Sequence, residues 1–404
     1  MRLDYFKLTL VLVLAMTGTA YAFPPIEVAD GKLLRITYEG QFGISYRDTG
    51  SGHDSDEDTY EFNFNRNRIG FIGTYNEWLG FYLQTEYIEQ KTINILSVDP
   101  SDSSRNFYVS DAYVRFMPYA FFNVFAGKLK HNLTRENLES CFESLTIDRS
   151  VFVSIPYKTS RDMGVAVWGN FLNNKLQYRV DAMDGHADSI YDPSPASTFR
   201  YTIRLQGSFL NPEKNYGLAG TYLGVKDVLT IGAAYQYESK AVYGDIRSKD
   251  KVKDYSAYSF DLFYEQTFKD IGTFTFSAAY LDISFDDAHT FADPGVGSYG
   301  LNGQKHGYYL KVGYLLPMDI GPGTLQVFAR YDDFTFANLN NVVTNTDFYD
   351  QDVKRTAFGM NYYLFKQDLK LTAEYSLTDF NNEDSNDPNY KDFSSFDLFL
   401  QVRF

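Results

Sequence analysis

The sequence predicts an all-β chain that folds as a transmembrane antiparallel β-barrel of about sixteen strands. Two observations carry this prediction. Apolar and polar residues alternate along runs of about ten residues, the length at which a tilted strand crosses a bilayer. The connections between these runs are alternately short and long, as expected when turns lie on one membrane face and excursions on the other.

The last run, Ser394 to Phe404, shows the alternation most clearly. Because successive side chains of a strand point to opposite faces, one set should face lipid and the other the barrel interior. The lipid-facing set is Phe396, Leu398, Leu400, Val402 and Phe404, and the interior set is Asp397, Phe399, Gln401 and Arg403. We expect this strand to close the barrel.

Similar runs recur through the chain, for example at Leu34 to Tyr46, Gly80 to Tyr87 and Phe107 to Phe116. Two segments fit less well. Asn211 to Asp227 is too long for a simple turn, and the run from Glu61 to Tyr75 changes phase in a way that predicts a β-bulge near Arg66 to Arg68. The short turns are expected at Asn76 to Leu79, Pro118 to Ala120, Phe171 to Asn174, Lys269 to Ile271, Pro317 to Pro322 and Phe365 to Gln367. The long loops are expected at Arg47 to Thr59, Lys91 to Ser104, His131 to Ser160, Gly185 to Ser197, Ala241 to Lys253, Phe285 to Lys305, Thr335 to Asp352 and Asn381 to Asp392.

The composition favours a barrel over a soluble β-sandwich or propeller. Aromatic residues make up 18% of the 404 residues, although the mean hydropathy is only -0.33. Aromatic girdles around a polar lumen explain this combination. Residues 1–22 have the layout of a cleavable signal peptide, with an apolar run from Leu8 to Met16 and Ala20-Tyr21-Ala22 before the expected cleavage site. Residues 23–404 then form a single barrel domain.

Charge and motifs argue against several functions. The net charge of -15 argues against a nucleic-acid partner. No metal-binding, phosphate-binding or nucleophile motif appears, so we expect no enzyme activity and no cofactor. Acidic loops and the group around His186 could hold calcium, but their spacing matches no defined calcium loop and a solvated surface is the simpler interpretation. The single cysteine, Cys141, is expected to be a small buried residue.

The loop from His131 to Ser160 carries apolar residues of its own and should therefore pack against something. In a wide barrel the available surface is the lumen wall, so we expect the loop to fold inward and narrow the pore. Candidate residues of this constriction are Lys128, Lys130, Arg135, Arg149 and Arg161. Further lumen candidates, assigned by strand alternation, are Asp111, Arg115, Arg179, Arg204, Lys311 and Arg330.

Four segments resemble the phosphate-selective porin O and P family of outer-membrane porins. They are RNRIGFIGTYNEWLGFYLQTEY from Arg66, VFAGKLKHNLTRENLESCFESLTIDRS from Val124 and SRDMGVAVWG from Ser160, together with the shorter SDAYVRF from Ser110. The clear match covers the first half of the mature chain. The resemblance implies a sixteen-stranded trimeric porin domain, a long inward-folded third extracellular loop, and basic side chains that guide anions such as phosphate. Lys128, Lys130, Arg149 and Arg161 stand where the family places recurrent polar or basic residues.

The lumen charges assigned by alternation depart from a dedicated phosphate channel, because basic and acidic residues nearly balance. This favours weakly selective, passive diffusion of small hydrophilic solutes or ions through the bacterial outer membrane. The expected partners are outer-membrane lipid, lipopolysaccharide, the solutes and two further copies of the chain in a homotrimer. The alternative function is a barrel that serves as a scaffold for a partner protein threaded through it or docked on its loops.

Overall fold

The computed structural model describes residues 25–53, 56–88, 106–150, 160–185, 195–245, 249–286, 305–339, 348–381 and 391–404. Most of them lie in β-strands. No helix among them is long and apolar enough to cross a bilayer.

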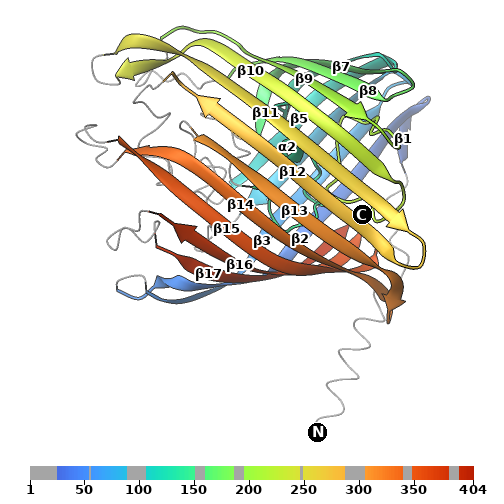
Figure 1. Ribbon diagram of the computed structural model, residues 1–404. Coiled ribbons are helices and arrows are strands. Elements are labelled where there is room, and N and C mark those ends of the chain that lie inside the picture. The colour runs from blue at the N-terminus through green and yellow to red at the C-terminus, as the bar shows by residue number, and fades with distance from the viewer. Residues whose placement is uncertain are drawn as a thin grey trace.

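A short first strand precedes sixteen strands that make up the barrel wall (Figure 1). The strands are β1 (Ile26–Ala29), β2 (Lys32–Ser51), β3 (Glu57–Thr74), β4 (Leu79–Ile88), β5 (Asn106–Tyr119), β6 (Phe122–Lys130), β7 (Arg161–Phe171), β8 (Leu176–Met183), β9 (Arg200–Ser208), β10 (Val228–Asp245), β11 (Asp250–Phe268), β12 (Gly272–Ser284), β13 (Lys305–Ile320), β14 (Gly323–Leu339), β15 (Phe348–Phe365), β16 (Leu369–Phe380) and β17 (Phe393–Arg403). A one-turn helix, α2 (Arg135–Leu138), lies between β6 and β7.

The barrel closes between its first and last full strands. Each strand from β2 to β17 pairs antiparallel with its neighbours in sequence, and β17 pairs with β2. At the seam the backbones of Tyr38 and Phe404 exchange two hydrogen bonds, of 3.2 and 2.9 Å. The predicted sixteen-stranded closed barrel is therefore confirmed, and β1 adds only a short hairpin against the start of β2.

The last strand has the predicted two faces. The side chains of Phe396, Leu400 and Phe404 are exposed on the outer surface, whereas Gln401 is 1% exposed and points inward. Along β9 and β16 the same alternation of buried and exposed positions continues. A wall of this kind presents an apolar band outward and polar side chains inward.

The short turns lie near the predicted positions, with that at Pro317 to Pro322 reduced to two residues, and three long loops are shorter than expected. β2 extends to Ser51 and β3 begins at Glu57. Likewise β10 extends to Asp245 and β11 begins at Asp250. In the same way β14 extends to Leu339 and β15 begins at Phe348. The predictions of long loops at Arg47 to Thr59, at Ala241 to Lys253 and at Thr335 to Asp352 are therefore wrong in extent. The polar residues there continue the strand ladder, because a strand that projects into water no longer needs an apolar face.

The predicted bulge is present in β3. Gln41 pairs with Arg66 and Phe42 pairs with Phe64, so Asn65 is the extra residue. A bulge shifts the phase of the following side chains by one position. Both Arg66 and Arg68 thereby point into the barrel on the same face as Asn63.

Gly43 on β2 tests the closure of the seam. A Cβ atom there would lie 2.0 Å from the carbonyl oxygen of Leu398 on β17. We expect Gly43→Ala to destabilise the folded barrel by about 1–3 kcal/mol, because the added methyl group separates the two strands. The free energy of unfolding is measured in urea, with the folded fraction determined from the heat-dependent gel mobility of the folded barrel. Gly207→Ala on β9 is the control, since its Cβ would find no atom closer than 3.7 Å, and equal stability of the two variants would contradict the account.

Candidate functional site: an inward-folded loop and a basic passage

Residues 131–150, which we call the inner loop, follow β6 and lie inside the barrel. Thr134 caps α2 at its amino end, because its hydroxyl accepts a hydrogen bond from the backbone N–H of Asn137 at 3.2 Å. The apolar side chains of the inner loop are buried: Leu133, Leu138, Phe142, Leu145 and Ile147. The rest of the predicted loop, residues 151–159, lies outside the described residues.

The backbone of the inner loop is fastened to strands β11, β15, β16 and β17. The carbonyl oxygen of Leu145 accepts a hydrogen bond from Asn361 on β15 at 2.9 Å, and that of Phe142 accepts one from Gln401 on β17 at 2.9 Å. Further bonds join Leu133 O to Ser259, Ser144 O to Lys370 and Ile147 N to Glu374. Since these partners face inward from the wall, residues 131–150 pack against that side of the lumen.

Charged side chains of the same wall also hold the inner loop. Lys311 on β13 forms an ion pair with Glu136 of α2. Arg330 on β14 pairs with Asp332 and donates to the carbonyl oxygen of Asp148 at 2.9 Å. These cations are nearly inaccessible to solvent, so they anchor the loop.

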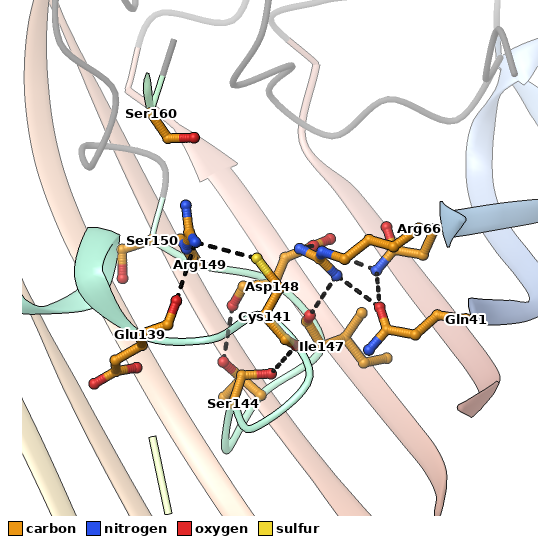
Figure 2. A network of polar contacts seen from close by, with 12 residues as sticks. Gln41, Arg66, Glu139, Cys141, Ser144, Ile147, Asp148, Arg149, Ser150 and Ser160 are labelled. Carbon is orange, nitrogen blue, oxygen red and sulfur yellow. Dashed lines mark hydrogen bonds and ion pairs between the residues drawn. The ribbon is translucent and has the colours of Figure 1, made fainter. Parts of the chain in front are cut away.

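The free edge of the inner loop faces β2 and β3 (Figure 2). Arg66 extends from β3 and donates to the carboxylate of Asp148 at 2.9 Å and to Gln41 at 2.7 Å. Arg149 folds back over the loop and donates to Glu139 O at 3.2 Å and to the Sγ of Cys141 at 3.1 Å.

A cavity of about 420 Å³ remains between the inner loop and the opposite wall. Strands β2 to β7 line one side of it, and the inner loop and the β9–β10 connection line the other. Its charged lining residues are Glu39, Arg68, Asp111, Arg115, Lys130 and Arg161, and its aromatic lining residues are Tyr82, Tyr113, Phe125, Trp168 and Tyr216.

The lining of this cavity carries more positive than negative charge. Four basic side chains face two carboxylates. One pair is internal, since Arg161 Nε lies 3.2 Å from Asp111, and Arg68 pairs at 2.8 Å with Glu86 beside the cavity. Arg115 has no ion-pair partner among the described residues. The excess of positive charge lowers the energy of an anion in the cavity relative to a cation.

Four predicted site residues are brought together here: Asp111, Arg115, Lys130 and Arg161 all line the cavity. Lys128 does not, because it lies one position out of phase and donates to Val109 O at 3.1 Å. Arg149 does not line the cavity either, because its side chain folds back onto the inner loop and donates to the Sγ of Cys141. The role of each residue in conduction stays a prediction.

The other predicted residues lie elsewhere in the interior as members of buried pairs and networks. Arg135 is fully buried and forms a bidentate ion pair with Glu213, at 2.7 and 2.8 Å. Arg204 pairs in the same way with Asp261 on β11. Arg179 stacks over Tyr216 at 4.7 Å, and Lys311 and Arg330 hold the inner loop. Alternation placed the four strand residues correctly on the inner face and Arg135 lies in the inner loop, although none of the five lines the cavity.

Arg68 is the basic lining residue that the sequence prediction missed. The change of phase in β3 was the available signal, because a bulge at Asn65 turns Arg66 and Arg68 inward together. The predicted near balance of lumen charge also needs correction for the cavity itself. Three of the balancing carboxylates, Asp261, Asp332 and Glu374, are paired on β9 to β16, where the inner loop covers part of the wall.

Cys141 lies among the basic residues at the edge of the cavity. Burial raises the pKa of its thiol, but the neighbouring Arg149, Arg66 and Arg68 outweigh that effect and hold the pKa well below its usual range. The residue is 6% exposed and lines the cavity. We therefore expect a buried but ionised sulfur.

His131, in the inner loop, is a fully buried histidine. Burial together with nearby Arg200 and Arg149 lowers its pKa to about 3, so it stays neutral. Within the described residues, no cluster of His, Cys, Asp or Glu is arranged to hold a metal ion. His186 and the acidic segment after Glu383 lie outside those residues.

Comparison with known proteins places this geometry in a class. A family model described as "Phosphate-selective porin O and P" matches residues 295–404, and the chain thus resembles that family. The match lies at the opposite end of the chain from the segments quoted above, so the prediction that the first half carries the clearer resemblance is not supported. A comparison with curated protein sequences gives no match.

Solved structures with the same fold include an anion-selective porin and an outer-membrane protein. The anion-selective porin from Comamonas acidovorans has 10% identity, a TM-score of 0.54, and coverage of 92% of this chain and 100% of its own. OmpF of Salmonella typhi has 12% identity, a TM-score of 0.56, and coverage of 94% and 100%. OmpT of Vibrio cholerae, in its trimer form, has 10% identity, a TM-score of 0.50, and coverage of 93% and 100%. At these identities the likeness establishes the porin fold.

Arg115 offers a test of the charge in the cavity. We expect Arg115→Gln to lower the preference of the pore for anions over cations by about two- to fivefold, because one unit charge near the ion path contributes roughly 1 kcal/mol in water and less in salt. Reversal potentials under a potassium chloride gradient measure the preference. Lys128→Gln removes an equal charge outside the cavity and should leave the potential unchanged. A shift of the same size in both variants would contradict the assignment.

Cys141 offers a test of the electrostatic environment. Because the thiolate is the reactive form and its pKa is lowered, modification by a methanethiosulfonate reagent should keep nearly the same rate from about pH 9 down to about pH 7. An ordinary cysteine, with a pKa of about 8.5, slows roughly tenfold per pH unit below that value. Arg149→Gln should raise the pKa and restore this pH dependence. A steep pH dependence in the unaltered protein would contradict the predicted pKa.

Proposed function

We propose that the chain is an outer-membrane porin that lets small hydrophilic solutes and ions diffuse passively, with a moderate preference for anions. The closed sixteen-stranded barrel supports the membrane location, since only helices and closed barrels satisfy all backbone hydrogen bonds in lipid. The matched family of porins supports the same class. No chemical step is involved, and the mechanism is size exclusion combined with electrostatic bias.

The observation that carries the proposal is the cavity beside the inner loop. Its volume of about 420 Å³ and its excess of basic side chains suit small hydrated anions. Passage along Arg68, Arg115, Lys130 and Arg161 would replace part of the hydration shell of an anion by charge-assisted hydrogen bonds. Phosphate is one such anion, and the description of the matched family favours testing it first.

Export and assembly belong to the same proposal. A signal peptide over residues 1–22, which lie outside the described residues, would direct the chain across the inner membrane. The exposed apolar side chains of the wall, including Phe81, Val165 and Ile203, would contact lipid, lipopolysaccharide or a neighbouring subunit. A homotrimer is the proposed assembly, since OmpT of Vibrio cholerae has the same fold and is described in a trimer form.

The alternative of a scaffold around a threaded partner fits the structure less well. The inner loop and the β9–β10 connection meet inside the barrel, where the carbonyl oxygen of Leu218 accepts a hydrogen bond from Ser140 N at 2.9 Å. The remaining cavity is too small for a polypeptide segment with side chains unless these elements leave the lumen. The size of the cavity has no bearing on a partner protein that docks on the outer loops.

Single-channel recording in a planar bilayer tests the proposal. With a potassium chloride gradient we expect an open channel whose reversal potential has the sign of anion preference, and we expect added phosphate to reduce the chloride current if phosphate binds in the cavity. A protein that forms no channel and causes no swelling of liposomes would contradict the porin proposal. A potential with the sign of cation preference would contradict the role given to the basic lining.

A further inference from the structure

The connection between β9 and β10, residues 209–227, enters the barrel from the end that carries the short turns. We call it the inner turn. Its ends are tied together at the barrel rim, where Asn211 donates to Asp227 O from its backbone N at 3.1 Å and from its side chain at 2.9 Å. Farther along, Leu218 and Ala219 are buried. A connection of this length with buried apolar residues is a packed element of the interior.

A buried carboxylate fixes the inner turn to the inner loop. Glu213 is 2% exposed and receives both terminal nitrogens of Arg135, and it also accepts hydrogen bonds from Tyr222 at 2.5 Å and Thr230 at 2.7 Å. Arg135 in turn donates to Ala219 O at 3.0 Å. Removing Arg135 would leave Glu213 buried without its ion pair, which is strongly unfavourable, whereas removing Glu213 would leave Arg135 with Glu139 at 3.2 Å.

The two segments also pair through their backbones. Glu139 and Leu218 form a parallel β-bridge, in which Leu218 N donates to Leu138 O at 3.1 Å and Ser140 N donates to Leu218 O at 2.9 Å. The bonds continue with Gly220 N to Glu143 O at 2.9 Å. The inner loop and the inner turn start at opposite ends of the barrel and are thus joined by backbone hydrogen bonds inside it.

The inner turn also supplies part of the cavity wall. Asn215, Tyr216 and Gly217 line the cavity opposite Arg115 and the other basic residues. The ring of Tyr216 packs on Phe125 and Trp168 at centroid distances of 4.8 and 5.5 Å. Asn215 and Gly217 are exposed, although the inner turn lies within the barrel. Their exposure is therefore to the passage itself.

We propose that the inner turn and the inner loop together form the constriction of the pore, and that Asn215 to Gly217 help determine its conductance and ion preference. This inference rests on the proposed function. It assigns a pore-lining role to a connection on the short-turn side, in addition to the third long loop. An ion crossing the barrel would pass between the inner turn and the basic side chains of β3, β5 and β7.

Gly217 is the position at which the inference can be tested with little damage to the fold. A Cβ atom at Gly217 would meet nothing within 4 Å, and the backbone there does not have the positive φ that disfavours other residues. A side chain added at this position extends into open space in the passage. Gly207 on β9 is the matched control, because it faces outward and its Cβ would lie 3.7 Å from Phe209.

The experiment places a cysteine at each position in a Cys141→Ser background. The thiolate of Gly217→Cys attacks the reagent sulfur of an anionic or a cationic methanethiosulfonate, forming a mixed disulfide and releasing sulfinate. We expect the adduct at 217 roughly to halve the single-channel conductance, because it occupies a large part of the passage. The anionic adduct should reduce the preference for anions, and the cationic adduct should increase it.

The control variant should show no effect, whereas a lack of effect at position 217 would count against the inference. Gly207→Cys should give adducts with unchanged conductance. A thiol at 217 that cannot be modified in the folded channel, or that is modified without effect on conductance and reversal potential, would overturn the inference. Gly217→Trp provides a second test that needs no reagent, and it should also lower the conductance.

The proposed function and this inference fail in different ways. If the unaltered protein forms no channel, the porin proposal fails and the role of the inner turn fails with it. If the unaltered protein conducts and both 217 variants conduct like it, only the role of the inner turn is refuted.

Discussion

The closed backbone ladder is the constraint on which the rest of the structure depends. In hydrocarbon each unpaired N–H or C=O group costs several kcal/mol, so a β-chain can cross a membrane only as a closed barrel. Here the ladder closes between β2 and β17, at a point where Gly43 leaves no room for a side chain. Closure forces one face of every strand inward, and the interior must then satisfy the charges that these faces carry.

Both sides of the interior contain ion pairs, and the cavity lies on the side of β2 to β7. On the side of β9 to β16 the charges form buried pairs such as Arg204 with Asp261 and Arg355 with Glu374. The inner loop is fastened to that side through strands β13 and β14. On the side of β2 to β7 space remains, and the side chains lining it are more basic than acidic. A lumen whose basic and acidic residues nearly balance therefore contains a cavity with a positively charged lining. The net negative charge of the whole chain thus says little about whether the pore prefers anions or cations.

The sequence was sufficient to predict the barrel, because alternation repeats in every strand and reports directly on which face is inside. In the last strand, for example, Leu400 faces out and Gln401 faces in. Alternation could not predict which inward residues would be covered. Lys311 and Arg330 were expected to line the pore, yet they anchor the inner loop, because folding of that loop brings its charged and polar groups against them. The length of Asn211 to Asp227 signalled an irregular connection but not its entry into the lumen.

Segments from opposite ends of the barrel meet inside it, and a disulfide cross-link between them can detect this contact. Glu139→Cys and Leu218→Cys in a Cys141→Ser background would place thiols on directly paired residues of the inner loop and the inner turn. The account predicts that mild oxidation of the folded barrel forms an intramolecular disulfide, seen as a mass loss of two hydrogens and as linked peptides after proteolysis. Two thiols that both stay free after oxidation, while the barrel remains folded, would contradict it.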